Sequence, residues 1–203
     1  MNGTEGKSIE KNPNPGTAFG PNQFFWFDTG IETFDEPFMM PATGFPTGRN
    51  TILPDIEKEL PKSTGYRFAI PSLDIDAEVA FLERQGTDYD ILGLGSKVGV
   101  LEGTALPGEG FSIIVGHNHL NTQEAGPFAL LQTVQEGDRV FITDAEDQLK
   151  VYQVTANLLL APDDMETLAA NASEDSIILI TCEDESLDGT YLHRRVVFAS
   201  PAA

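Results

Sequence analysis

The sequence predicts a mainly β fold, a closed antiparallel or mixed barrel. Between residues 66 and 200, short apolar runs rich in β-branched residues alternate with turn sequences, as expected for many short strands. Helical signals are confined to two brief segments. This combination favours a barrel, although the strand pattern by itself also fits a β-sandwich.

The first predicted strands follow one another closely along the chain. Residues 66–70 form a run that ends at Pro71, and residues 77–82 form a second run after a stretch of alternating acidic and apolar residues. The strand pattern continues through a Gly-rich region as three further runs, at residues 90–95, 97–101 and 111–116.

The second half of the pattern contains both predicted helical segments. Residues 128–134 can form one or two helical turns, because Pro127 is tolerated in a first turn. Residues 162–166 open a short helix to Asn171, since their carboxylates are favourable at a helix N-terminus. Turns are predicted at residues 144–147 and at Asp188-Gly189. The remaining runs are predicted strands, at residues 139–143, 149–160, 177–181 and 196–199.

Residues 1–65 differ from the barrel, which is expected over residues 66–203. Proline and glycine recur too often in this stretch for a long regular element, which predicts an extended N-terminal arm. The arm also contains a dense aromatic cluster, Phe24-Phe25-Trp26-Phe27. Because aromatic side chains are costly to expose to water, we expect at least part of the arm to pack against another surface.

Composition excludes several classes of function. The 203 residues include 32 acidic and 12 basic side chains, a net charge of −20, which disfavours binding to nucleic-acid phosphates. The hydrophobic content of 40% is typical of a globular domain with a buried core. No stretch approaches the roughly 18 consecutive apolar residues of a membrane span, and residues 1–15 lack the basic start and apolar centre of a signal peptide.

Cys182 is the only cysteine, and it follows the apolar run 177–181 at the point where the chain becomes polar. Arg194 and Arg195 open the next apolar run. If the two runs are neighbouring strands, the thiol lies beside a fixed positive charge, which can lower a thiol pKa or hold a developing oxyanion. The alternative is a structural cysteine, because a lone Cys is most often a small buried hydrophobe.

A base for this thiol is available in Gly116-His117-Asn118-His119, which follows the apolar run 111–115. His117 and His119 are two residues apart, so both face the same side of an extended segment and both are candidates at this point. His193 is expected to face solvent or to support the site. A zinc site is not expected, because no additional Cys or His completes a ligand set.

Together these residues resemble the signature of the sortase family. Leu179-Ile180-Thr181-Cys182 is similar to the end of its Thr-Leu-x-Thr-Cys motif, with Ile178 at the first Thr position. An Arg then opens the last strand, and a Gly-His pair precedes the Cys. The resemblance spans roughly residues 66–200. Further matching segments are residues 101–104, 106–108 and 137–138.

The resemblance implies a closed eight-stranded β-barrel that acts as a cysteine transpeptidase without a cofactor. Cys182 is then the nucleophile, His117 the acid and base, and Arg194 the residue that binds the oxyanion or the substrate backbone, while Thr181 supports the thiol. Because side chains alternate along a strand, only one of Arg194 and Arg195 can face the cleft. Some class A sortases bind Ca²⁺ on loops beside the cleft, but no metal is expected here. The acidic residues considered for such a site are Glu102, Glu109, Asp163, Asp164 and Glu166.

Sortases cleave a Leu-Pro-x-Thr-Gly sorting signal between Thr and Gly and pass the acyl group to an amine. The resemblance therefore implies surface proteins or pilins as substrates, with a cell-wall crossbridge or a pilin lysine as the acceptor. It also implies the outer face of the membrane of a Gram-positive bacterium and a membrane anchor, although this sequence predicts no anchor. Two alternatives stay open: a non-catalytic β-barrel binding module in which Cys182 is a core residue, and a sortase-like thiol hydrolase.

Two hypotheses concern the arm. Asp35-Glu36-Pro37-Phe38 resembles the Asp-Pro-aromatic lid of class C, pilin-polymerising sortases with Glu36 inserted, so Asp35, Pro37 and Phe38 are candidate lid residues. Met40-Pro41-Ala42-Thr43-Gly44 resembles the sorting signal itself, with Met in place of Leu. If the match is more than chance, this segment is a built-in pseudosubstrate, and deletion of residues 1–51 should raise activity.

Overall fold

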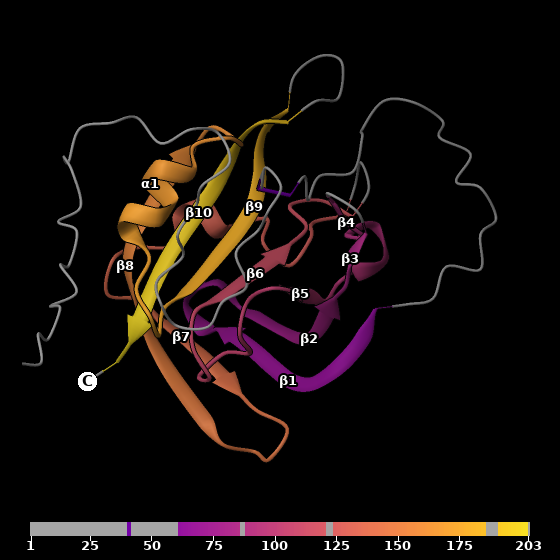
Figure 1. Ribbon diagram of the computed structural model, residues 1–203, viewed down its shortest axis with the longest axis vertical. Helices are drawn as coiled ribbons and strands as arrows, with labels where there is room; N and C mark the ends of the chain where they lie inside the picture. The colour runs from indigo at the N-terminus through magenta and orange to yellow at the C-terminus, as the bar shows by residue number, and fades with distance from the viewer. Residues whose placement is uncertain (1–39, 42–60, 86–87, 121–123, 186–190, 203) are drawn as a thin grey trace, which may run out of the picture.

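Eight strands close into a barrel in the computed structural model of the chain (Figure 1), in the order β1-β2-β5-β6-β9-β10-β8-β7. The structure describes residues 40–41, 61–85, 88–120, 124–185 and 191–202. The barrel strands are β1 Lys62–Ile70, β2 Ile75–Leu82, β5 Val98–Leu101, β6 Ser112–Gly116, β7 Arg139–Thr143, β8 Leu149–Leu160, β9 Ile177–Glu185 and β10 Tyr191–Pro201. The predicted eight-stranded barrel is thereby confirmed.

The barrel is mixed, because β2 pairs with β5 and β6 pairs with β9 in parallel, while the other six neighbouring pairs are antiparallel. Parallel neighbours need a long connection, and the connection from β6 to β9 includes β7, β8 and a helix. A separate two-stranded sheet consists of β3 Arg84–Gln85 and β4 Asp88–Tyr89. Short 3-10 helices occur at η1 Pro71–Leu73, η2 Leu92–Leu94 and η3 Leu131–Thr133.

Two apolar clusters lie on opposite sides of the barrel wall. All eight strands contribute buried side chains to the first cluster, which therefore fills the barrel interior. The second cluster, hereafter the outer cluster, lies on the other face of β6, β9 and β10. Along β9, Leu179 belongs to the interior and Ile178 and Ile180 to the outer cluster. Burial on both faces explains why β9 is a continuous apolar run rather than an alternating one.

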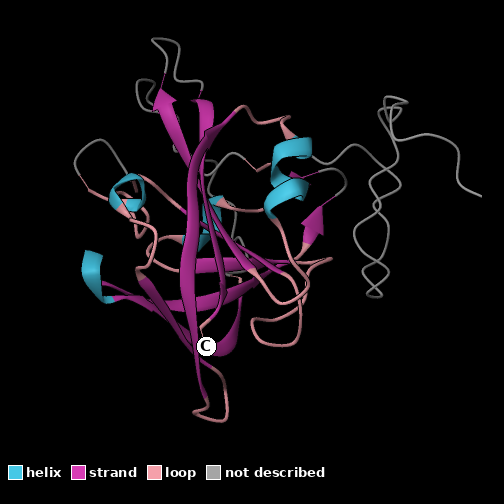
Figure 2. Cartoon of the chain, turned by 90° about the vertical axis from the view of Figure 1, so that its left-hand side faces the viewer, coloured by secondary structure: helices cyan, strands magenta, loops and turns pink. Residues whose placement is uncertain are grey.

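Helix α1, Met165–Asn171, covers the outer cluster (Figure 1, Figure 2). Its first turn forms because the Asp164 carboxylate accepts a hydrogen bond from the backbone N–H of Thr167 at 3.1 Å. The helix buries Met165 and Leu168 in the cluster. The short helix predicted after Pro162 is therefore present. Within the described residues, no helix is long and apolar enough to cross a membrane.

The sequence prediction was accurate for β7 and β8 and wrong for residues 90–95. The predicted turn at 144–147 joins β7 to β8, and the Asp144 carboxylate accepts the N–H groups of Glu146 and Gln148 at 3.0 and 2.8 Å. Residues 90–95 were expected to be a strand, but they contain the 3-10 helix η2. Gly95, with φ of +55°, ends that helix, and such a backbone conformation interrupts a strand.

Candidate active site

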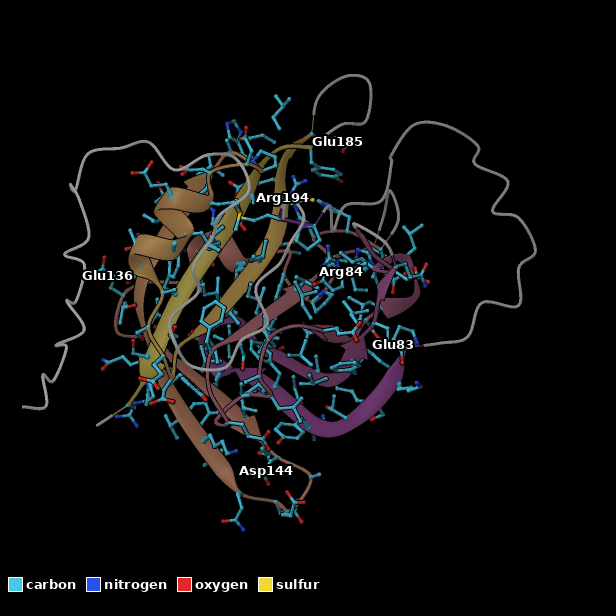
Figure 3. The ribbon with its side chains drawn as sticks, viewed as in Figure 1. Glu83, Arg84, Glu136, Asp144, Glu185 and Arg194 are labelled. Carbon is cyan, nitrogen blue, oxygen red and sulfur yellow. The ribbon has the colours of Figure 1, made fainter. Side chains whose placement is uncertain are left out.

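Cys182 on β9 and Arg194 on β10 are direct partners in the antiparallel register. Side chains of directly opposed residues lie on the same face of a sheet, about 5 Å apart at Cβ. The pair two positions away, Ile180 and Val196, belongs to the outer cluster, so alternation places the thiol and the guanidinium on that outer side. Figure 3 shows Arg194 toward the end of the barrel where β9 leads to Glu185.

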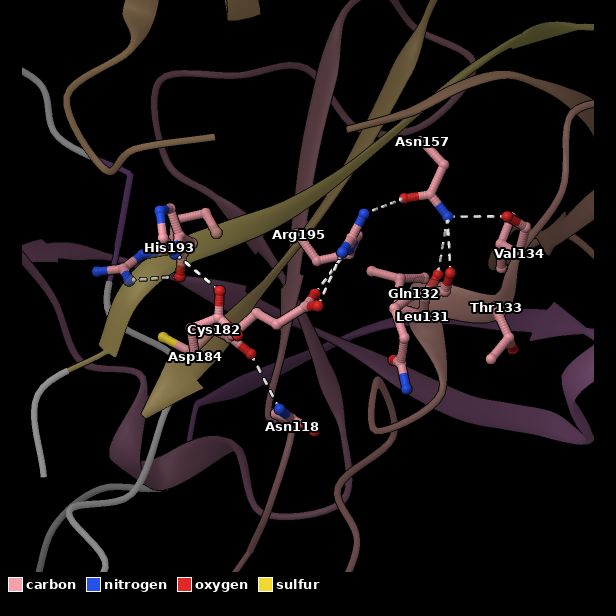
Figure 4. Close-up of polar contacts among 12 residues, drawn as sticks. Asn118, Leu131, Gln132, Thr133, Val134, Asn157, Cys182, Asp184, His193 and Arg195 are labelled. Carbon is pink, nitrogen blue, oxygen red and sulfur yellow. Dashed lines mark hydrogen bonds and ion pairs between the residues drawn. The ribbon is translucent and has the colours of Figure 1, made fainter. Parts of the chain in front are cut away.

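His117 reaches the same place from β6. Val115 pairs with Ile180 in the parallel register, and His117 and Cys182 each lie two residues further along the chain. Two cross-links hold these segments together. The Thr181 hydroxyl donates to the Gly116 carbonyl at 2.8 Å, and the Asn118 amide donates to the carbonyl of Cys182 at 3.0 Å (Figure 4).

The His117 side chain is fully buried, and its orientation is set by the main chain around it. Nε2 lies 2.9 Å from the Ile91 carbonyl oxygen. A carbonyl oxygen only accepts hydrogen bonds, so this contact is a hydrogen bond in the tautomer with the proton on Nε2. Gly126 packs directly behind His117, since a Cβ at residue 126 would lie 2.2 Å from the His117 oxygen.

Arg194 is 5% exposed and is held by main-chain carbonyls. Its Nη1 donates to the oxygens of Tyr191 and His193 at 3.2 and 3.0 Å. Its Nε donates to the oxygens of Pro41 at 3.0 Å and Met40 at 3.4 Å, residues of the N-terminal arm. Each of these four hydrogen bonds therefore goes to a backbone oxygen rather than to a carboxylate.

Arg195 lies on the opposite face, where it pairs with Thr181 in the register. It binds the Glu183 carboxylate through two hydrogen bonds of 2.6 and 2.7 Å, and its Nη1 donates to Asn157 at 3.3 Å. Asn157 in turn donates to the carbonyls of Leu131, Gln132 and Val134 (Figure 4). This network holds the η3 segment against the barrel. The two adjacent arginines therefore bind different groups on opposite faces of β10.

The other polar groups near the site are more exposed or are structural. His119 is exposed, and His193 is 40% exposed and bonds through Nδ1 to Asp184 at 2.8 Å. Tyr191 is buried, and this burial raises its pKa to about 12, with Glu185 and Cys182 adding to the rise. In the described part of the chain, no group of three or more His, Cys, Asp or Glu side chains could hold a metal ion.

The candidate lid residues Asp35, Pro37 and Phe38 lie outside the described residues. Sequence reasoning missed Asn118, Gly126 and the Ile91 carbonyl, all of which contact the His117 or Cys182 main chain or side chain. Asn118 had one signal, its position directly after His117. The Ile91 carbonyl had none, because any residue can supply a backbone oxygen.

Comparison with known proteins identifies a family. Residues 68–202 match the family model described as Sortase domain. No curated protein matches the chain.

Solved structures are also similar. Sortase A from Corynebacterium diphtheriae is 29% identical, with a TM-score of 0.56, over 72% of this chain and 63% of that one. Sortase C-1 from Actinomyces oris is 26% identical, with a TM-score of 0.54, over 68% of this chain and 73% of that one. The chain therefore spans less than two thirds of the Corynebacterium structure.

Proposed function

The chain belongs to the sortase family, and from this premise we propose that it is a cysteine transpeptidase acting on a Leu-Pro-x-Thr-Gly-like sorting signal. The observation that carries the proposal is the pairing of Cys182 with Arg194 on the outer face of β9 and β10, with His117 beside them. A thiol, an imidazole and a guanidinium are the groups that acyl transfer through a thioester requires.

In the first half of the reaction, Cys182 Sγ attacks the carbonyl carbon of the signal's Thr. The Thr–Gly C–N bond breaks, an S–C bond forms, and the leaving amine takes from His117 the proton that the Cys182 thiol gave up. Because Nε2 of His117 is engaged by the Ile91 carbonyl, Nδ1 is the position that exchanges this proton. In the second half, His117 Nδ1 removes a proton from the incoming amine, which attacks the thioester and releases Cys182.

Arg194 holds the main chain of the signal while this happens. Sequence reasoning left two roles for it, the oxyanion and the substrate backbone. Its bonds to the carbonyls of Met40 and Pro41 support the backbone role, because they are the contacts that a bound peptide would make. Thr181 is a positioning residue, because its hydrogen bond to the Gly116 carbonyl holds β9 against the end of β6.

Substrates and acceptors follow from the family. We propose surface proteins or pilins as the donors, and a cell-wall precursor crossbridge or a pilin lysine as the amine, at the outer face of a Gram-positive cell membrane. Both sortase A and sortase C structures are among the similar proteins, so the class of sortase is not assigned.

A second function has one observation in its favour. Cys182 is 0% exposed, as expected for a structural cysteine in a non-catalytic binding module. Labelling with a thiol reagent separates the two functions. An active site that opens to substrate gives labelling of the native protein, whereas a sealed core cysteine reacts only at the rate of global unfolding.

The decisive experiment is a cleavage assay with a panel of fluorogenic sorting peptides, with and without amines. We expect cleavage that disappears in Cys182→Ala, and an amine-dependent transfer product detected by mass spectrometry. Cleavage with water as the sole acceptor throughout the panel would instead assign a thiol hydrolase. Absence of cleavage for every peptide would refute the transpeptidase.

A further inference from the structure

The residues that Arg194 binds come from the far N-terminal part of the same chain. Met40 and Arg194 are 154 positions apart, yet the Arg194 Nε donates to the carbonyls of Met40 and Pro41. The N–H of Met40 donates to the carbonyl of Pro162 at 3.1 Å, in the connection between β8 and α1. Figure 1 shows this short indigo segment beside β9. Met40 is thus bonded at both its N–H and its C=O, as a peptide laid across a binding site would be.

The side chain of Met40 is as firmly held as its backbone. It is 1% exposed and belongs to the outer cluster. The same cluster includes Leu160, at the end of β8, and Met165 and Leu168, from α1. The Met40 side chain therefore lies among apolar residues, and its main chain has polar partners at both the N–H and the C=O.

These contacts do not depend on the identity of Met40 beyond its apolar character. Backbone N–H and C=O groups are the same in any peptide, and a Leu side chain has nearly the same volume as Met. The sequence at this point reads Met40-Pro41-Ala42-Thr43-Gly44, an apolar residue, Pro, any residue, Thr and Gly. Residues 42–44 lie outside the described residues, so the contacts of Met40 and Pro41 alone carry the inference.

We propose that Met40 and Pro41 are an internal ligand of the peptide-binding site, retained in the protein and displaced by the sorting peptide. This inference rests on the proposed function for the identity of the incoming peptide. The site takes an apolar residue followed by proline, with Arg194 on the carbonyls of that pair and the Pro162 carbonyl on the N–H of the apolar residue. In the unliganded protein, the arm then occupies the peptide-binding site. The apparent affinity for substrate is lower because only chains with a released arm can bind the peptide.

The test is a binding measurement on the full chain carrying Cys182→Ala, which prevents any reaction. The probe is a fluorescein-labelled Leu-Pro-Ala-Thr-Gly peptide, and its Kd is measured by fluorescence anisotropy. Met40→Asp places a charge in the apolar outer cluster and releases the arm, so we expect the Kd to fall by about tenfold or more. Met40→Leu is the matched control, because it keeps an apolar ligand and should leave the Kd within about twofold.

A second measurement needs no change to the arm. An unlabelled peptide with the sequence of residues 38–44 should displace the probe from the Met40→Asp protein, because it supplies the internal ligand from outside. Circular dichroism of each variant checks that the fold is kept. An unchanged Kd in a folded Met40→Asp protein, or no displacement by the 38–44 peptide at millimolar concentration, overturns the proposal.

The outcomes also separate this inference from the proposed function. Active enzyme with an unchanged Kd in Met40→Asp would refute the internal ligand alone. Tighter probe binding in Met40→Asp, combined with no cleavage of any peptide, would refute the transpeptidase and keep the internal ligand. The intact mass of the active wild-type protein should stay constant on incubation. A fragment beginning at Gly44 would make the segment a substrate and overturn the proposal that it is retained.

Discussion

Cys182 and Arg194 face each other across one rung of the β9–β10 ladder, whereas Arg195, the next residue, faces the opposite side. Because side chains alternate along a strand, these two neighbouring arginines contact different groups. Arg194 binds backbone carbonyls on the outer face, and Arg195 forms an ion pair with Glu183 and holds Asn157.

Substitution of the two arginines should give opposite results. We expect Arg194→Lys to lower kcat/KM by about 100-fold, because an ammonium cannot reproduce the directed donors that position the peptide. Arg195→Lys should keep kcat/KM within about threefold but lower the unfolding free energy by about 1 kcal/mol, since a partly exposed bidentate pair is lost. Peptide cleavage and urea unfolding measure these two quantities, and equal activity loss in both variants would contradict the assignment.

Gly126 should be required for activity more than for stability. A Cβ at this position would lie 2.2 Å from the His117 oxygen and 2.9 Å from its Cβ, so Gly126→Ala must displace His117. We expect kcat to fall by at least about 100-fold, the usual cost of misplacing a catalytic group. Steady-state kinetics measures this.

Gly95→Ala is the matched control for Gly126→Ala. Gly95 has φ of +55° and open space around it, so alanine there strains only the backbone. Its thermal midpoint should fall while kcat is kept. If Gly126→Ala were folded and fully active, the position of His117 would not matter to catalysis.

Substitution of two asparagines should distinguish a hydrogen bond that positions Cys182 from hydrogen bonds that stabilise the fold. Asn118 bonds to the Cys182 carbonyl at 3.0 Å, so Asn118→Ala should reduce kcat by about tenfold through loss of one positioning bond. Asn157 bonds to three carbonyls of the η3 segment, so Asn157→Ala should lower the unfolding free energy by about 1–3 kcal/mol. Its kcat should change little. Steady-state kinetics and urea unfolding measure these two quantities; a loss of kcat in Asn157→Ala and not in Asn118→Ala would exclude the positioning role.

The tyrosines predict how stability changes at high pH. Burial raises the pKa of Tyr89, Tyr152 and Tyr191 to about 12, from an ordinary value of 10.0. Because the folded state favours the protonated phenol, this contribution to stability is complete below pH 10 and is lost between about pH 10 and 12. Tyrosinate absorbance and loss of circular dichroism should therefore rise together in that range. Ionisation of these tyrosines near pH 10 in a folded protein would contradict it.

Much of the architecture was predictable from local patterns. The strands β7 and β8 were located by the polar turn between them, and β9 by an apolar run ending in the only cysteine. Alternation of side chains implied that only one of Arg194 and Arg195 faces the cleft, and the family resemblance favoured Arg194. The register places the two on opposite faces of the sheet. Residues 90–95 were misassigned because a short apolar run with two glycines fits a strand as well as a 3-10 turn.

The remaining features of the site depend on contacts between distant backbone groups. Hydrogen bonds from His117 to the Ile91 carbonyl and from Met40 to the Pro162 carbonyl involve no particular side chain on the acceptor, so no sequence pattern marks them. The packing of Gly126 behind His117 has a similar origin, since a glycine needed for close approach resembles a glycine needed for a turn. The hydrophobic periodicity of a sequence indicates its helices and strands, whereas these contacts form only when those elements pack together.

The parallel pairing of β6 with β9 also determines when the site is assembled. Thr181 and Gly116, whose contact accompanies this pairing, are 65 positions apart, and the closure of so long a loop is entropically unfavourable until the strands between them are in place. We therefore expect the thiol to meet its imidazole only in the last phase of folding. Under the proposed function, a half-folded chain would then be unable to form the thioester, and it would not join other proteins before it is fully folded.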